Sequence, residues 1–176
     1  MEQARWAWMA ILAVSAAESL AAQSSDCAKE RTLLRARFGS NVDFVPGQQT
    51  CAVTGDFNRD RKPDIAMLAR PVTASPPPAT LVATANPWKP SRAARWTKGS
   101  LALAVVLEGP SPRLFLLTDP EFFSTPIWAH PVKLISRLER PKGGADRIAV
   151  ATEGGPDLQL YWSGSAWKME VPNEEP

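Results

Sequence analysis

The chain has 176 residues, of which 44% are hydrophobic and 22% are charged, and its formal net charge at pH 7 is +2. This length allows one domain with a substantial core. The charge is too small to indicate a nucleic-acid partner, so this class of function is not expected.

The first 22 residues have the pattern of a secretory signal peptide. Arg5 precedes an apolar run over residues 6–14, and small residues surround Ala21. The run is about a dozen residues long, too short to cross a bilayer core of ~30 Å as a stable anchor. A retained N-terminal anchor is the alternative, and Glu18 disfavours it. We therefore expect a secreted or periplasmic protein with no stable membrane span after cleavage.

Two cysteines, Cys27 and Cys51, remain in the mature chain, which carries 19 basic and 16 acidic residues, a net charge of +3. In an exported protein such a pair predicts a disulfide. Closing a loop of about 25 residues should stabilise the fold by ~3 kcal/mol. Two free buried thiols are the alternative.

A short amphipathic helix is expected to begin after Asp26, as its cap, and to end near Phe38. Leu33 and Leu34 fall near the same face as Phe38, and charged residues occupy the other faces. Gly39 stands where a helix C-terminus favours a left-handed residue. This helix should pack on a sheet, with the disulfide tying its start to the next hairpin.

Residues 55–66 read Gly-Asp-Phe-Asn-Arg-Asp-Arg-Lys-Pro-Asp-Ile-Ala. Oxygen-bearing side chains alternate here along a short loop, as in loops that wrap a hard cation such as calcium. The candidate calcium ligands are the side chains of Asp56, Asn58, Asp60 and Asp64 and the backbone carbonyl of Lys62. The segment resembles the G-D-F-N-G-D-G-K-P-D-I-A motif of FG-GAP and VCBS-type repeats, and the resemblance extends over residues 55–68. It implies an extracellular β-hairpin module of the kind used in cell-surface recognition.

Two interpretations of this loop stay open. In the first the loop binds calcium weakly, although Arg59 and Arg61 replace glycines of the motif and the three acids face three basic residues, for a formal charge of zero. In the second the Asp and Asn side chains accept hydrogen bonds from backbone N–H groups and hold the turn without a metal.

Strands are expected near residues 51–54, 64–69, 80–84, 101–107, 113–118, 131–137, 147–152, 158–162 and 166–171. The run over 101–107 is continuously apolar, which predicts a central strand covered on both faces. The turn at 109–112 makes the next strand its antiparallel neighbour. Trp162 and Trp167 are expected to lie across the last hairpin from one another.

These elements predict an α+β fold: one short N-terminal helix packed on a mostly antiparallel β-sheet, a meander of hairpins. The domain should span 23–176, with a Pro-rich insertion at 71–100. The 55–66 motif occurs once, and a propeller needs several copies, so the chain cannot form one by itself.

The Pro-rich insertion contains basic residues between two tryptophans. The candidate binding residues there are Trp88, Arg92, Arg95 and Trp96. They could contact a glycan, an anionic polymer or a phospholipid surface by charge and stacking. The alternative is a solvated hairpin whose tryptophans fold onto the sheet.

Catalysis has little support in the sequence. His130 has no marked nucleophile beside it, and Asp119, Glu121 and Glu153 fit ordinary turns as well as they fit a carboxylate pair. The function we expect is therefore an exported, non-catalytic binding or structural domain that contacts a protein or glycan at the cell surface. The alternative is a cell-envelope hydrolase or inhibitor that uses the Trp- and Pro-rich surface.

Overall fold

The structure is a computed structural model that describes residues 27–45, 50–82, 96, 98, 101–117, 132–139, 144–152, 157–170 and 172. These residues form one helix and ten strands. Their bounds are α2 Ala28–Phe38, β1 Val42–Phe44, β2 Val53–Gly55, β3 Asp64–Pro71, β4 Thr80–Val82, β5 Ala102–Leu107, β6 Arg113–Leu117, β7 Val132–Leu138, β8 Arg147–Thr152, β9 Leu158–Trp162 and β10 Trp167–Glu170.

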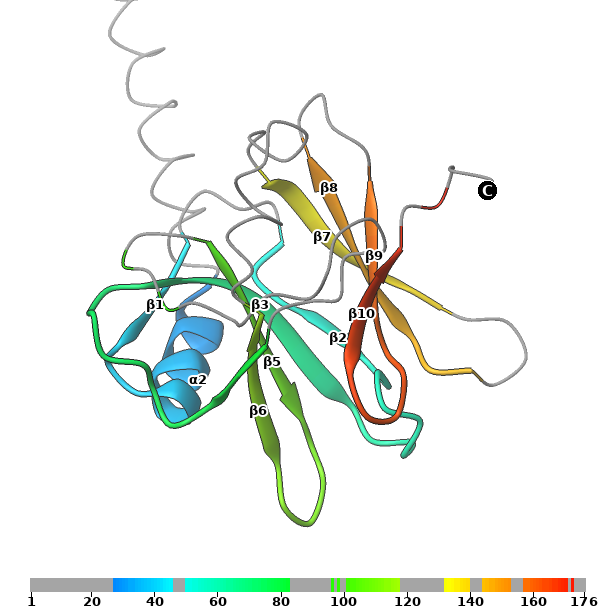
Figure 1. Ribbon diagram of the computed structural model, residues 1–176, viewed down its shortest axis with the longest axis horizontal. Helices are drawn as coiled ribbons and strands as arrows, with labels where there is room; N and C mark the ends of the chain where they lie inside the picture. The colour runs from blue at the N-terminus through cyan, green and yellow to red at the C-terminus, as the bar shows by residue number, and fades with distance from the viewer. Residues whose placement is uncertain are drawn as a thin grey trace, which may run out of the picture.

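The strands form two sheets (Figure 1). One has six strands in the order β1-β3-β5-β6-β4, with β2 also paired to β3, and the other has four in the order β10-β9-β8-β7. The pairings are antiparallel except that of β4 with β6, which is parallel. The predicted α+β class, one short helix with mostly antiparallel sheet, is confirmed.

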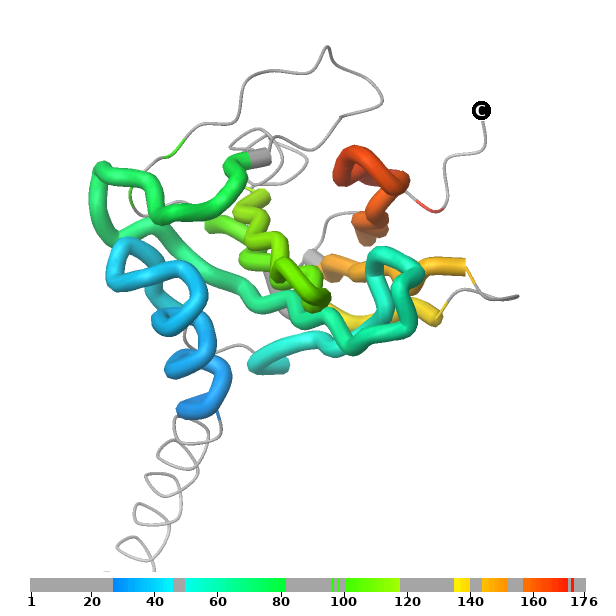
Figure 2. Tube along the Cα trace, turned by 90° about the horizontal axis from the view of Figure 1, so that it is seen from below, coloured from blue at the N-terminus to red at the C-terminus, as the bar shows by residue number. Residues whose placement is uncertain are grey.

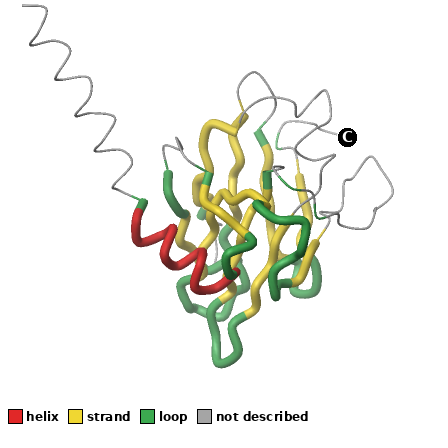
Figure 3. Tube along the Cα trace, turned by 90° about the vertical axis from the view of Figure 1, so that its left-hand side faces the viewer, coloured by secondary structure: helices red, strands yellow, loops and turns green. Residues whose placement is uncertain are grey.

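The core lies on both faces of the six-stranded sheet, because successive residues of a strand point to opposite sides. Ala66 and Leu68 of β3 belong to a cluster shared with all four strands of the other sheet, here called the inner cluster. Met67 and Ala69 belong to a second cluster shared with α2, the helix-side cluster. The molecule therefore has three layers, α2, the six-stranded sheet and the four-stranded sheet (Figures 2 and 3).

Strand β5 is the centre of this arrangement, and all six of its residues are buried. Leu103 and Leu107 face the inner cluster, whereas the small side chains of Ala102 and Ala104 face α2. The predicted central strand, covered on both faces, is confirmed.

Helix α2 buries Leu34 and Phe38 against the sheet, as its apolar pattern predicted. Gly39 ends it with φ 77°, and its N–H donates to the carbonyl of Arg35 at 2.9 Å. The N-cap position is occupied by Cys27, which makes no side-chain capping hydrogen bond. The expected cap, Asp26, is one residue too early and lies outside the described residues.

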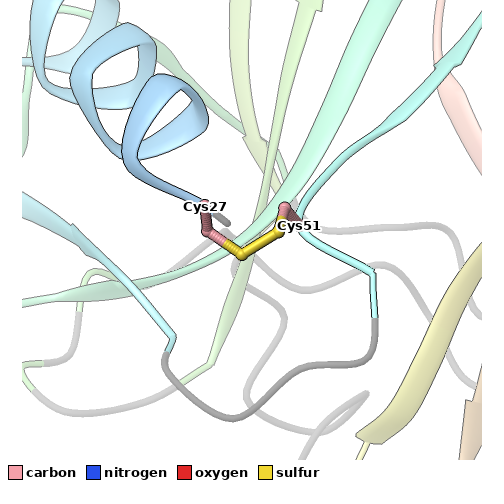
Figure 4. Close-up of a disulfide and its surroundings, with 2 residues drawn as sticks. All are labelled: Cys27 and Cys51. Atoms are coloured by element: carbon pink, nitrogen blue, oxygen red, sulfur yellow. A yellow bond between two sulfur atoms is a disulfide. The ribbon is translucent and has the colours of Figure 1, made fainter. Parts of the chain in front are cut away.

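The predicted disulfide between Cys27 and Cys51 is confirmed (Figure 4). It joins the residue before α2 to the segment that leads into β2, with the two Cα atoms 5.4 Å apart. The helix is thus covalently tied to the hairpin that carries the 55–68 segment.

Two features differ from the sequence-based prediction. The strands form two stacked sheets rather than one, because the C-terminal strands β7–β10 cover apolar residues of β3, β5 and β6 that a single sheet would leave exposed. Strand β1 was not predicted, since three residues carry too little pattern. The predicted signal peptide lies outside the described residues, and none of the helices among those residues is long and apolar enough to cross a membrane.

Candidate functional site

The turn between β2 and β3, residues 56–64, is here called the aspartate loop. Gly55 and Asp64 pair across its base in antiparallel register. Within it, Arg59 and Arg61 adopt left-handed backbone conformations with φ 64° and 65°. Glycine adopts these angles without strain, so the loop bends at the two positions where the resembled motif has glycine.

The polar side chains of the aspartate loop accept hydrogen bonds from its own backbone. The two carboxylate oxygens of Asp56 accept from the N–H groups of Asp60, at 3.0 Å, and Arg61, at 2.9 Å. Asn58 Oδ1 accepts from Asp60 N–H at 2.9 Å. Asp60 Oδ1 accepts from Lys62 N–H at 2.9 Å. These bonds are those of an Asx-type turn and satisfy donors that no strand partner could reach.

Asp64 holds the loop to the rest of the sheet and has no exposed surface. Its two oxygens accept from the N–H groups of Phe57 and Glu108, each at 2.8 Å. Burial raises the pKa of Asp64 to about 6, because desolvation disfavours the charged form more than the two N–H donors favour it, and the carboxylates of Asp60 and Asp56 add to the rise.

The aspartate loop also contacts the second sheet through Asp146, which stands just before β8. Asp56 N–H donates to Asp146 Oδ2 at 2.9 Å, and Asp146 N–H donates to the carbonyl of Asp56 at 2.8 Å. Arg137 of β7 pairs with the same carboxylate, with Nε 3.4 Å from Oδ2. Sequence reasoning missed Asp146, because 90 residues separate it from its partner and only the packing of the sheets brings them together.

The fit of calcium to this loop depends on how its oxygens converge. Within the described part of the chain, no group of three or more His, Cys, Asp or Glu side chains is gathered as a metal site requires. The oxygens of Asp56, Asn58, Asp60 and Asp64 are directed to N–H donors instead. Within the described residues, the carbonyl of Lys62 accepts no hydrogen bond. In this geometry the donor types suit calcium but their placement does not, and calcium binding stays a prediction.

Of the four candidate binding residues in the Pro-rich insertion, the structure describes one. Trp96 is half-buried against the helix-side cluster, and its indole N–H donates to the carbonyl of Thr73 at 2.8 Å. This side chain therefore holds the segment that follows β3 next to the helix-side cluster. Trp88, Arg92 and Arg95 lie outside the described residues, as do His130, Asp119, Glu121 and Glu153.

A groove not expected from the sequence lies beside the parallel pair β4 and β6. It measures about 760 Å³ and is here called the aromatic groove. Its lining residues are Pro77, Pro78, Ala79, Thr80, Pro112, Arg113, Leu114, Phe115 and Trp162. The sequence placed Pro77 and Pro78 in the Pro-rich insertion at 71–100, and no sequence signal placed them beside Trp162.

Three aromatic rings support the groove. The centroids of Phe115 and Trp162 are 5.3 Å apart, and Trp167 lies 5.7 Å from Trp162 and 6.2 Å from Phe115. Trp162 and Trp167 are paired across the β9–β10 hairpin, which confirms the predicted contact. Trp167 is 1% exposed and packs against the rings of Phe115 and Trp162, which line the groove.

In comparisons with models of protein families, with curated proteins and with solved structures, nothing matches this chain. The resemblance of residues 55–68 to FG-GAP and VCBS-type repeats therefore stays a prediction that rests on the motif itself.

Proposed function

We propose that the protein is an exported, non-catalytic binding module that takes its ligand in the aromatic groove. The observation that carries this proposal is the groove itself. It is a wide groove, open to solvent, and its volume of about 760 Å³ is comparable with the roughly 300–1,000 Å³ of ligand pockets. Its lining combines apolar rings with one cation, the mixture that gives a site both affinity and orientation.

The rigidity of the surrounding body supports the same proposal. The Cys27–Cys51 disulfide ties α2 to the β2–β3 hairpin, and Asp56 and Asp146 tie that hairpin to the second sheet. A disulfide suits an oxidising, extracytoplasmic compartment, where a small domain meets glycans and surface proteins. The modules that residues 55–68 resemble serve in cell-surface recognition, which is the role proposed here.

The test is to fill the groove without removing a core contact. Thr80 is an exposed lining residue on β4, and Thr80→Trp should block the groove. Thr54→Trp is the matched control, because Thr54 is also exposed, lies on β2 and is not among the residues that line the groove. Both variants would be applied to arrays of defined glycans and peptides. We expect at least one ligand whose binding is lost in Thr80→Trp and kept in Thr54→Trp. The absence of any such ligand would refute the proposal.

Calcium is a separate question from groove binding. Calcium bound by the loop would stabilise the folded state by mass action. Such binding would show as a melting temperature that millimolar calcium raises in the wild type and leaves unchanged in Asp60→Ala. A melting temperature that responds to neither calcium nor chelator would remove calcium from the account and leave the binding proposal intact.

A further inference from the structure

The guanidinium group of Arg113 lies over two aromatic rings of the groove. Its central carbon lies 5.0 Å from the centroid of Trp162 and 5.9 Å from that of Phe115. Contacts of this kind are cation–π interactions, and they favour a position of the charged group close to the rings.

An arginine that contacts an aromatic ring by a cation–π interaction does not use its N–H donors as hydrogen bonds in that contact. Within the described residues, no carboxylate pairs with Arg113 and no acceptor takes its N–H groups. Among the described residues that line the groove, Arg113 is the one that carries a charge. The site thus presents a fixed cation, with donors suited to a planar carboxylate, beside apolar rings.

The groove exists because the inner face of the six-stranded sheet extends past the other sheet. Thr80 of β4 pairs with Phe115 of β6, so their side chains point to the same face. Phe115 is 7% exposed beneath the second sheet, whereas Thr80 is exposed. Cover by the second sheet ends between these two strands, and Trp162 forms the rim.

The backbone of the groove is poor in free hydrogen-bond donors. Pro77, Pro78 and Pro112 have no N–H, and the N–H of Ala79 already donates to the carbonyl of Pro77 at 2.8 Å. An extended peptide that adds to a sheet edge needs alternating backbone donors and acceptors. Residues 77–79, which precede the edge strand β4, lack such donors, so this part of the groove favours a ligand recognised through rings and charge.

We propose that the aromatic groove binds an acidic saccharide, a sugar chain whose rings bear carboxylates. Its carboxylate accepts hydrogen bonds from Arg113, and the C–H face of the sugar ring packs on the proline rings and on the part of Trp162 that Arg113 leaves uncovered. This inference rests on the proposed function, since it names the ligand class of the same groove.

The test uses three probes on the full protein in the presence of a chelator, measured by calorimetry and by tryptophan fluorescence. The first is a short oligomer of galacturonic acid, which has both rings and charge. The second is the same oligomer as its methyl ester, which keeps the rings and loses the charge. The third is an oligoglutamate peptide, which keeps the charge and lacks the rings. We expect binding of the first probe, and affinities at least tenfold lower for the other two.

Variants assign the binding to this site. Arg113→Gln should lower affinity for the galacturonate oligomer about tenfold to a hundredfold, as expected when hydrogen bonds to a charged group are lost. Arg70→Gln is the matched control and should keep wild-type affinity, because Arg70 is exposed on β3 and does not line the groove. Unfolding midpoints of both variants would be measured to verify that the fold is kept.

Several outcomes would overturn the inference. These are no binding of the acidic oligomer, equal binding of its methyl ester, equal or tighter binding of oligoglutamate, or binding that Arg113→Gln leaves unchanged. If another ligand class still binds and is blocked by Thr80→Trp, the proposed binding function survives and only the acidic saccharide is wrong. If nothing binds in a Thr80-dependent way, both fail.

Discussion

At the scale of single residues, Asp64 is the fully buried acidic residue of the aspartate loop. Its carboxylate has no exposed surface, and burial raises its pKa from the ordinary value of 3.8 to about 6. The folded protein therefore holds this proton more tightly than the unfolded chain does. The stabilising contribution is complete below about pH 4 and is lost as the pH rises through about 6.

The prediction is a fall in unfolding free energy, on the order of 3 kcal/mol, between pH 4 and pH 7 that is attributable to Asp64. Denaturant titrations of the wild type and of Asp64→Asn, in chelator, would measure it. Asparagine does not titrate, so its pH profile should lack this fall. Identical profiles for the two proteins would contradict the assignment.

Arg59 and Arg61 carry backbone strain, since both have φ near 65°. Replacing either by glycine should raise the unfolding free energy by about 0.5–1 kcal/mol, because relief of the left-handed strain exceeds the added entropy of the unfolded chain. Lys62→Gly is the control: Lys62 has no positive φ, so the same change there should destabilise. Chemical denaturation would measure whether the unfolding free energy rises, as expected at Arg59 and Arg61, or falls, as expected at Lys62.

At the scale of elements, Gly55 lets β2 approach the second sheet closely. A Cβ atom at this position would lie 2.8 Å from a ring carbon of Phe57 and 2.9 Å from Asp146 Oδ2. Gly55→Ala should therefore cost about 1–3 kcal/mol of unfolding free energy. At Gly109 the nearest atom would be 3.8 Å away, so Gly109→Ala should change stability by less than about 0.5 kcal/mol. Equal effects of the two changes would show that the contact at Gly55 is not tight.

The disulfide also acts at the scale of elements, because it joins α2 to the β2–β3 hairpin. It joins residues separated by 24 positions, and replacing both Cys27 and Cys51 by alanine should lower the unfolding free energy by about 3 kcal/mol. Denaturation of the wild type with and without reductant should reproduce the difference. Reductant should leave the double variant unaffected, and any response there would point to an effect unrelated to the bond.

At the scale of the whole molecule, the two sheets share one inner cluster and should unfold together. Trp167 of the four-stranded sheet and Leu103 of the six-stranded sheet both belong to that cluster. Separating the sheets would expose the inner cluster on both of them, so a single cooperative transition is expected. Far-ultraviolet circular dichroism and tryptophan fluorescence should give coincident denaturation curves. Separate midpoints would indicate that the sheets are independent units.

Much of the architecture was predictable from local pattern. The helix ending at Phe38, the doubly covered strand β5 and the Trp162–Trp167 hairpin contact all follow from periodicity, turn residues and apolar runs, which depend on near neighbours in the chain. Strand β1 was missed because its three residues form a strand only through pairing with β3.

The features of the candidate site likewise divide into those that local sequence predicts and those that depend on tertiary contacts. Sequence alone determined the class of the fold, the pairing of the two cysteines and the presence of an oxygen-rich turn at residues 56–64, because each depends on residue types and short spacings. Only the tertiary structure decided that Asp146 closes that turn, that the strands stack as two sheets, and that Arg113 lies against Trp162 beside a groove. Those contacts join residues far apart in the chain. They arise because burying two apolar faces against one another lowers the free energy of the folded protein, and the pattern of a single short segment does not show which faces will meet.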